Sequence, residues 1–238
     1  MKFNVSTAVI LCGGRGTRLY PITKKIPKPL ANVSGKPFIY FLIEQLISFK
    51  IKKIIFLTGY KSDLFKKTVN KFNKFKKKIN FVFKKTPVNW ETSKRLNSIK
   101  SIGESFFLLL YSDNLVYFNY SNYLKSINKS KIVNLIVQNK LLAKEVGNIQ
   151  EKRKKNLYSS KRKKNYKYVE LGYCIISKKI FNYVNSKNIS FSATLEKLSN
   201  ENNLGIYKVT NKYHSITNLN ALKKSNKTLL KLRKKNLE

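Results

Sequence analysis

A buried strand that runs directly into a glycine-rich loop is the feature that most restricts how this chain can fold. Residues 7–19 read Thr-Ala-Val-Ile-Leu-Cys-Gly-Gly-Arg-Gly-Thr-Arg-Leu. The continuous apolar run at 8–12 is typical of a strand covered on both faces, as in parallel α/β sheets. Gly13, Gly14 and Gly16 lack a Cβ, so their backbone can reach positive φ and bring N–H groups close to an anion. The pattern predicts a phosphate site at the end of a parallel strand.

Fixed positive charge accompanies the loop. Arg18 lies at its end, and Lys28 follows between Pro27 and Pro29. Such cations can neutralise a triphosphate whose negative charge shifts during a reaction. Glycine-rich loops also form ordinary turns, so the loop alone is weak evidence. Its position after a strand, together with Arg18 and Lys28, favours the phosphate site.

Apolar runs and helical stripes alternate along the rest of the chain. We expect strands at 53–58, 79–83, 106–111, 132–137, 168–177, 205–209 and 213–216, and helices at 37–49, 64–75, within 90–102, and at 178–184, 191–198 and 219–237. The two lysine- and arginine-rich clusters at 152–155 and 161–164 flank 156–160 and predict a surface hairpin. This β-α-β alternation predicts an α/β fold, Rossmann-like, with a mixed, mostly parallel sheet flanked by helices.

Asp113 directly follows the strand expected at 106–111. Open α/β sheets bind ligands in the crevice beyond the carboxyl ends of their strands, so Asp113 and the glycine loop should face one site. The alternative is that Asp113 only caps a turn or the following helix.

Length and charge limit the function classes. The 238 residues are enough for one globular domain, and no apolar run approaches the roughly 20 residues that cross a bilayer. We therefore expect a cytoplasmic protein without a membrane span. The net charge of +39 raises nucleic acid as a partner, but lysine and asparagine are spread over the whole chain, which favours a compositional bias. A basic nucleic-acid protein stays an alternative, and the oligomeric state, a homo-oligomer included, stays open.

The opening residues resemble the sugar-1-phosphate nucleotidyltransferase family. Its signature, a strand followed by Gly-Gly-x-Gly-Thr-Arg-Leu and then Pro-Lys-Pro, matches residues 13–19 and 27–29. Residues 32–38 are similar to the family's next segment, and 108–113 to its metal-binding strand end. The resemblance covers most of the chain but is sharp only over about the first forty residues. It implies a single nucleotidyltransferase domain over 1–238, which transfers a nucleoside monophosphate from an NTP to a sugar 1-phosphate and releases pyrophosphate in nucleotide-sugar synthesis.

The resemblance also implies residue roles. Arg18 and Lys28 would be catalytic, through the leaving pyrophosphate and a phosphate respectively, and Asp113 would hold Mg²⁺. The acceptor would be contacted by Lys161, Glu170 and Gly172. Nucleotide contacts would come from Leu11, Cys12, Gly13, Gly14, Gly16 and Thr17. Lys161 lies in a basic run, where a solvated charge is the commoner outcome, and Glu170 could be an ordinary strand residue.

Two segments depart from the family pattern. Residues 88–96 (Val-Asn-Trp-Glu-Thr-Ser-Lys-Arg-Leu) stand where many relatives have Pro-Leu-Gly-Thr-x-Gly, so base and sugar recognition can differ. Ser215 stands where the family has a second metal-binding aspartate, and a hydroxyl is a poorer Mg²⁺ ligand.

The ending 213–218 is similar to that of heptose 1-phosphate nucleotidyltransferases, which makes a heptose 1-phosphate the leading acceptor. The alternative function is a weak or inactive member of the fold that acts as a binding or regulatory subunit.

Overall fold

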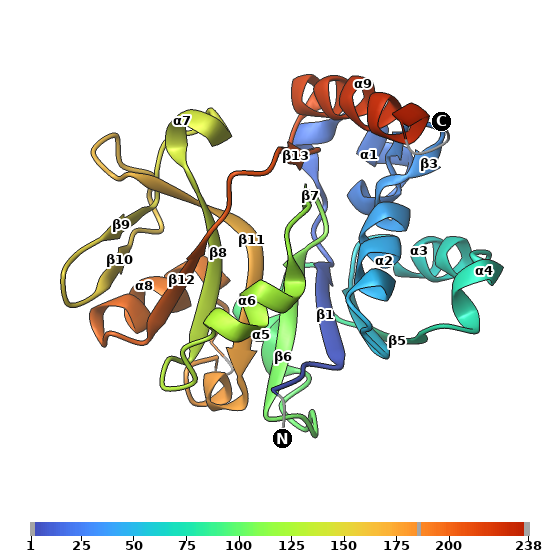
Figure 1. Ribbon diagram of the computed structural model, residues 1–238. Helices are drawn as coiled ribbons and strands as arrows, with labels where there is room; N and C mark the ends of the chain where they lie inside the picture. Colours follow the sequence, from blue (N-terminus) through green and yellow to red (C-terminus); the bar gives the residue numbers. More distant parts are fainter. Residues whose placement is uncertain (1–2, 185–186, 236–238) are drawn as a thin grey trace.

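The computed structural model describes residues 3–184 and 187–235, and a nine-stranded sheet forms its centre (Figure 1). The strands of this sheet are β1 (Thr7–Cys12), β4 (Lys53–Thr58), β5 (Asn80–Lys85), β6 (Phe106–Tyr111), β8 (Val133–Asn139), β9 (Ile149–Glu151), β10 (Asn156–Tyr158), β11 (Tyr168–Ser177) and β12 (Leu204–Lys208). Their order is β10-β9-β11-β6-β1-β4-β5, and β8 pairs with both β11 and β12. Two small ladders join β2 (Asn32–Val33) to β3 (Lys36–Pro37), and β7 (Asn114–Val116) to β13 (Tyr213–Ser215).

The amino-terminal half of the sheet is parallel. β1 lies between β4 and β6, with Val9 opposite both Ile55 and Leu109. β11 then runs antiparallel to β6. The predicted mixed α/β fold is therefore confirmed. Because β1 and β6 point the same way, the loop after β1 and the turn after β6 emerge at one edge of the sheet.

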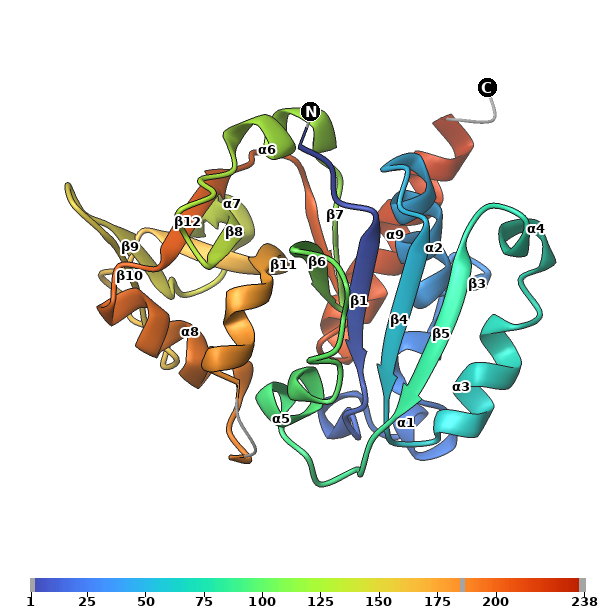
Figure 2. The ribbon, with the colours of Figure 1, turned by 90° about the horizontal axis from the view of Figure 1, so that it is seen from below.

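Helices cover both faces of the sheet (Figure 2). They are α1 (Ile22–Lys25), α2 (Phe38–Ser48), α3 (Ser62–Val69), α4 (Asn73–Lys76), α5 (Thr92–Asn97), α6 (Tyr120–Ser126), α7 (Lys140–Ala143), α8 (Phe191–Asn200) and α9 (Leu219–Lys235), with 3-10 turns η1 (Thr17–Leu19), η2 (Lys28–Leu30) and η3 (Lys178–Asn182). Alternate residues of β1 point to opposite faces, as a strand requires. Ile10 packs in the cluster that contains α2, whereas Val9 and Leu11 pack with α5 and α8.

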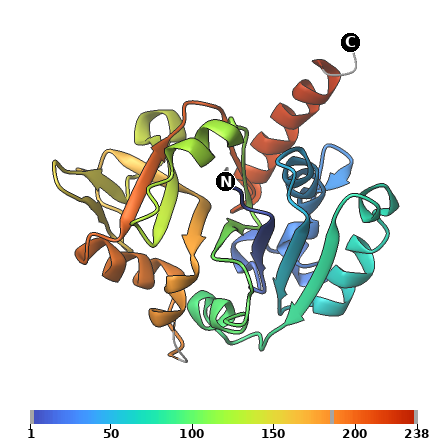
Figure 3. The same ribbon diagram turned by 60° about the horizontal axis from the view of Figure 1, so that its bottom comes forward.

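The carboxy-terminal helix α9 returns to the amino-terminal part of the chain. The red helix lies beside the blue segments in both Figure 1 and Figure 3. Leu222 and Leu229 join the cluster around α2, and the backbone N–H of Ser34 donates to Asn226 Oδ1 at 2.6 Å. The helix expected over 219–237 is seen to Lys235, and positions 236–237 lie outside the described residues.

Two expected elements differ in the structure. The helix expected over 64–75 is divided into α3 and α4, because the chain turns at 70–72 and places Phe72 and Phe75 against Tyr40, with ring centroids at 5.4 and 4.8 Å. The surface hairpin exists, but its turn is the basic cluster at 152–155, and 156–158 forms its second strand. Tyr158 is buried, and its N–H donates to Ser199 Oγ, which fixes this segment as a strand.

Within residues 3–184 and 187–235, no helix has both the length and the apolar character needed to cross a bilayer.

Candidate functional site

The loop after β1 is held in one conformation by Gly16. This residue has φ 66° and ψ 35°, a left-handed conformation that L side chains rarely adopt. Thr23 Oγ1 donates to Gly16 O at 2.8 Å, which fixes the loop against α1. A Cβ at position 16 would lie 3.0 Å from Cβ of Lys28. The glycine therefore lets the loop fold directly over Lys28.

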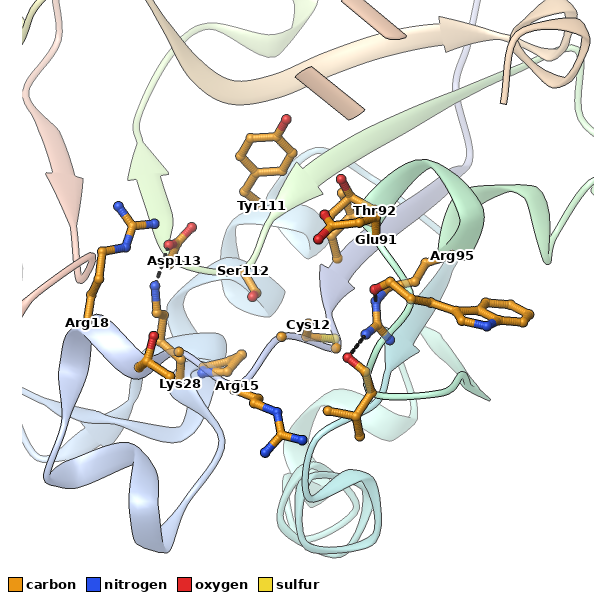
Figure 4. Close-up of a pocket in the computed structure, with 18 of the residues that line it drawn as sticks. Cys12, Arg15, Arg18, Lys28, Glu91, Thr92, Arg95, Tyr111, Ser112 and Asp113 are labelled. Carbon is orange, nitrogen blue, oxygen red and sulfur yellow. Dashed lines mark hydrogen bonds and ion pairs between the residues drawn. The ribbon is translucent and has the colours of Figure 1, made fainter. Parts of the chain in front are cut away.

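Lys28 and Asp113 meet at the sheet edge. Lys28 begins η2, Asp113 occupies the turn between β6 and β7, and Lys28 Nζ lies 2.9 Å from Asp113 Oδ2. The side chains are 12% and 21% exposed. The N–H of Ile216, just after β13, donates to Asp113 O at 3.0 Å and fixes the turn. Arg18 and Lys28 point toward Asp113 (Figure 4), so the predicted convergence of cations and carboxylate is present.

A cleft of about 520 Å³ runs from this ion pair along the sheet edge. Its volume suits a nucleotide-sized ligand. The lining residues are Leu11, Cys12, Gly13, Gly14, Arg15, Gly16, Thr17, Arg18, Lys28, Pro29, Val88, Asn89, Trp90, Glu91, Thr92, Arg95, Tyr111, Ser112, Asp113 and Ser192. All nine residues expected at the nucleotide, catalytic and metal positions are therefore on one cleft. Burial raises the pKa of Cys12, so its thiol stays protonated.

Three residues expected at the acceptor lie apart from this lining. Lys161 is exposed in the segment after β10. Glu170 is buried in β11, its Oε1 accepts the N–H of Gly172 at 2.9 Å, and burial raises its pKa to about 7. Gly172 has φ 77°, and a Cβ there would lie 2.6 Å from Asn114 Nδ2 and 3.1 Å from Tyr111 Cβ. Gly172 thus lies against Tyr111, a residue of the cleft lining, and Glu170 is bonded to Gly172 from within β11.

Sequence reasoning tied residues 88–96 to base and sugar recognition but named no site residue on this second wall of the cleft. Residues 88–92, here called the 88–92 wall, lie opposite the glycine loop together with Ser192 at the start of α8. Arg95 of α5 packs inside this wall and is 2% exposed. The available signal was the departure of 88–96 from the family's glycine-rich loop. Nothing in the sequence indicated that Arg95, among 50 basic residues, would be buried.

The donor set for a metal ion consists of one carboxylate at the phosphate end. Among the described residues, no three His, Cys, Asp or Glu side chains cluster as a metal site. Ser215 is paired with Asn114 across the β13–β7 ladder, next to Asp113, and its hydroxyl bonds Thr217 Oγ1. Mg²⁺ in proteins commonly uses one or two carboxylates plus substrate phosphates and water. Asp113 fits an ion of that kind, carried on a phosphate chain.

Comparison with known proteins gives relatives that match parts of the chain. D-glycero-alpha-D-manno-heptose 1-phosphate guanylyltransferase of Campylobacter jejuni is 49% identical over 59 residues, which is 25% of this chain and 27% of that protein. The Bacillus subtilis protein named probable glucose-1-phosphate cytidylyltransferase is 33% identical over 134 residues, 47% of this chain and 52% of its own. The matches thus span about a quarter and about half of these relatives.

Solved structures share the fold over nearly the whole chain. HddC from Yersinia pseudotuberculosis complexed with GMP-PN has a TM-score of 0.77 at 24% identity, covering 94% of this chain and 100% of that one. The inositol-1-phosphate CTP transferase from T. maritima has a TM-score of 0.78 at 18% identity, with coverages of 98% and 96%. The family model described as "Nucleotidyl transferase" matches residues 7–161. Since that match covers well over half of the 238 residues, the chain belongs to the nucleotidyl transferase family.

Proposed function

We propose that this protein transfers a nucleoside monophosphate from an NTP to a sugar 1-phosphate and releases pyrophosphate. The observation that carries the proposal is the single cleft on which Arg18, Lys28 and Asp113 meet the glycine loop. An inactive binding subunit is not favoured, because these charged groups are assembled and the relatives are named as transferases. We also propose that residues 1–238 act as one domain, which the continuous sheet supports.

The reaction needs alignment and charge neutralisation more than proton transfer. A phosphate oxygen of the acceptor attacks the α-phosphorus, a new P–O bond forms, and the bond to the bridging oxygen breaks, so pyrophosphate leaves with the electron pair. The attacking oxygen is already anionic and needs no general base. Lys28 and Arg18 lie where they can bind the phosphates and the charge that develops on the leaving group. Bound Mg²⁺, held by Asp113 and phosphate oxygens, would supply further neutralisation.

We propose a heptose 1-phosphate as acceptor and GTP as the first donor to test. The heptose 1-phosphate guanylyltransferase match and the GMP-PN complex of HddC support this choice. CTP is the second donor, because the longer match is to a protein named as a cytidylyltransferase. For the acceptor we keep Lys161, Glu170 and Gly172 as proposed contacts; Gly172 lies against Tyr111, which lines the cleft.

The proposal is tested by measuring pyrophosphate release from five NTPs: ATP, GTP, CTP, UTP and dTTP. Each is supplied with Mg²⁺ and a panel of sugar 1-phosphates. Asp113→Ala should lower the rate on the order of 100-fold, since it removes the carboxylate beside Lys28. Asp63→Ala is the matched control, because Asp63 is the only other aspartate and its side chain is 87% exposed. Its rate should stay within about twofold of wild type. Absence of pyrophosphate with every pair, or equal loss in both variants, would contradict the proposal.

A further inference from the structure

Arg95 is a buried cation without a carboxylate partner. It is 2% exposed, and no acidic oxygen lies within ion-pair distance of its guanidinium among the residues that the structure describes. Burying a charge is costly unless hydrogen bonds satisfy it. The guanidinium of Arg95 therefore needs hydrogen-bond acceptors around it. The segments that supply these acceptors are the ones whose positions Arg95 fixes.

The guanidinium is wrapped by the segment that leads into the 88–92 wall. Nε donates to Trp90 O at 2.9 Å, and Nη2 donates to Val88 O at 2.9 Å. Nη1 donates to the hydroxyl of Thr86 and, at 3.5 Å, to Thr58 O at the end of β4. Two carbonyls of the wall are thereby fixed to one rigid, planar group and, through it, to the sheet.

The other side of the guanidinium lies against the glycine loop. A Cβ on Gly13 would overlap Nη1 and Cζ of Arg95, and a Cβ on Gly59 would lie 2.6 Å from Nη1. Glycine at both positions therefore makes room for Arg95. The guanidinium fills the space between loop and wall, and so it sets their separation at this end of the cleft.

Asn188 holds the wall from outside. Its Oδ1 accepts the N–H of Glu91 at 2.6 Å, and its Nδ2 donates to Asn89 O at 3.1 Å. Bonded by Arg95 on one side and by Asn188 on the other, the backbone of the wall is fixed by contacts within the protein. A preformed wall lowers the ordering cost of binding.

Figure 4 places Arg18, Lys28 and Asp113 at one end of the cleft and Arg95 with the wall at the other. Because one cleft runs from Lys28 to Arg95, we place the base of a nucleotide toward Arg95 when its phosphates lie at Lys28. We propose that Arg95 is a positioning residue that holds the 88–92 wall in the shape that selects the donor's base, an inference that rests on the proposed function.

The test compares ligands with and without a base. Dissociation constants of the five NTPs and of inorganic tripolyphosphate are measured by calorimetry for the full chain, Arg95→Met, Arg95→Lys and Arg153→Met. Arg153, in the hairpin turn, is the matched control for loss of one charge, because it is exposed and far from the cleft. In Arg95→Met, the preferred NTP should bind about tenfold more weakly, and the dissociation constants of the NTPs should differ from one another by only a few-fold. The affinity for tripolyphosphate should stay unchanged. Arg95→Lys should recover part of the preference, and Arg153→Met should match wild type.

Two outcomes would overturn the inference. One is an unchanged NTP preference in Arg95→Met. The other is an equal loss of tripolyphosphate and NTP affinity, which would show that Arg95 supports the glycine loop or the fold in general. The proposed function fails separately, if the wild-type protein binds a preferred NTP but transfers its nucleoside monophosphate to no sugar 1-phosphate.

Discussion

At the scale of residues, the three loop glycines have three different roles. Gly13 leaves space for the Arg95 guanidinium, a Cβ on Gly14 would meet nothing within 4 Å, and Gly16 alone has positive φ. The sequence predicted that all three would bring N–H groups toward an anion. It could not separate them, because the missing Cβ of Gly13 matters only when Arg95, 82 positions later, folds against it.

This difference predicts that alanine destabilises the protein at position 16 but has little effect at position 14. Gly16→Ala should lower the free energy of unfolding by about 1–2 kcal/mol, because φ 66° strains an L residue and the new Cβ presses on Lys28. Gly14→Ala should change it by less than about 0.5 kcal/mol. Urea unfolding measures both values. Equal destabilisation of the two variants would show that the left-handed turn is not what requires glycine at position 16.

Glu170 predicts a pH dependence of stability. Burial raises its pKa from the ordinary 4.5 to about 7, so the folded protein keeps a proton that the unfolded chain releases above pH 4.5. Protonated Glu170 therefore contributes roughly 3 kcal/mol to the free energy of unfolding. This contribution is fully present below pH 4.5 and is lost as the pH rises to about 7. Relative to Glu170→Gln, wild type should lose about that much stability between these pH values in denaturant titrations. Glu44→Gln, an exposed control in α2, should follow wild type, and a parallel course of the wild-type and Glu170→Gln curves would refute the assignment.

At the scale of elements, the small β7–β13 ladder decides what surrounds Asp113. β13 comes about a hundred positions after β7, yet it pairs Ser215 with Asn114 and binds the Asp113 carbonyl through Ile216 N–H. Sequence reasoning found strand 213–216 but not its partner. The broken helix at α3 and α4 has the same origin, because packing on Tyr40 overrides the helical pattern.

The ladder makes Ser215 the position at which to add a metal ligand. Ser215→Asp should reduce the Mg²⁺ concentration for half-maximal pyrophosphate release by about tenfold, because a second carboxylate joins Asp113. Without Mg²⁺ the same variant should be less stable than Ser215→Asn, since two like charges become neighbours. Activity titrations and thermal unfolding measure the two effects. An unchanged Mg²⁺ requirement would show that the cation is held elsewhere.

At the scale of the whole molecule, most of the net charge of +39 comes from lysines on the surface and not from the residues of the cleft. Lysines are exposed on α3, at the β9–β10 turn and on α9, that is, on surfaces far apart in the fold. Scattered cations give weak, salt-sensitive binding, whereas a dedicated nucleic-acid surface concentrates them.

We therefore expect binding to a short DNA duplex to disappear between about 50 and 150 mM salt, while binding of the preferred NTP persists. Fluorescence anisotropy over a salt series measures the duplex, and calorimetry the NTP. Duplex binding that survives near 150 mM salt, and that Arg18→Ala leaves intact, would restore the nucleic-acid alternative.

The sequence by itself determined the elements whose signals are local. The strand and glycine loop at 7–19, the helix α2 and the strands β4, β6 and β11 follow from apolar periodicity and from turn residues next to one another in the chain. Asp113 could be placed because the ends of parallel strands share an edge. Only the tertiary structure decided that Arg95 would be buried against Gly13, that β13 would pair with β7, and that packing on Tyr40 would break a helix. These depend on contacts between distant positions, whose free energy exists only once the chain has closed the loops between them.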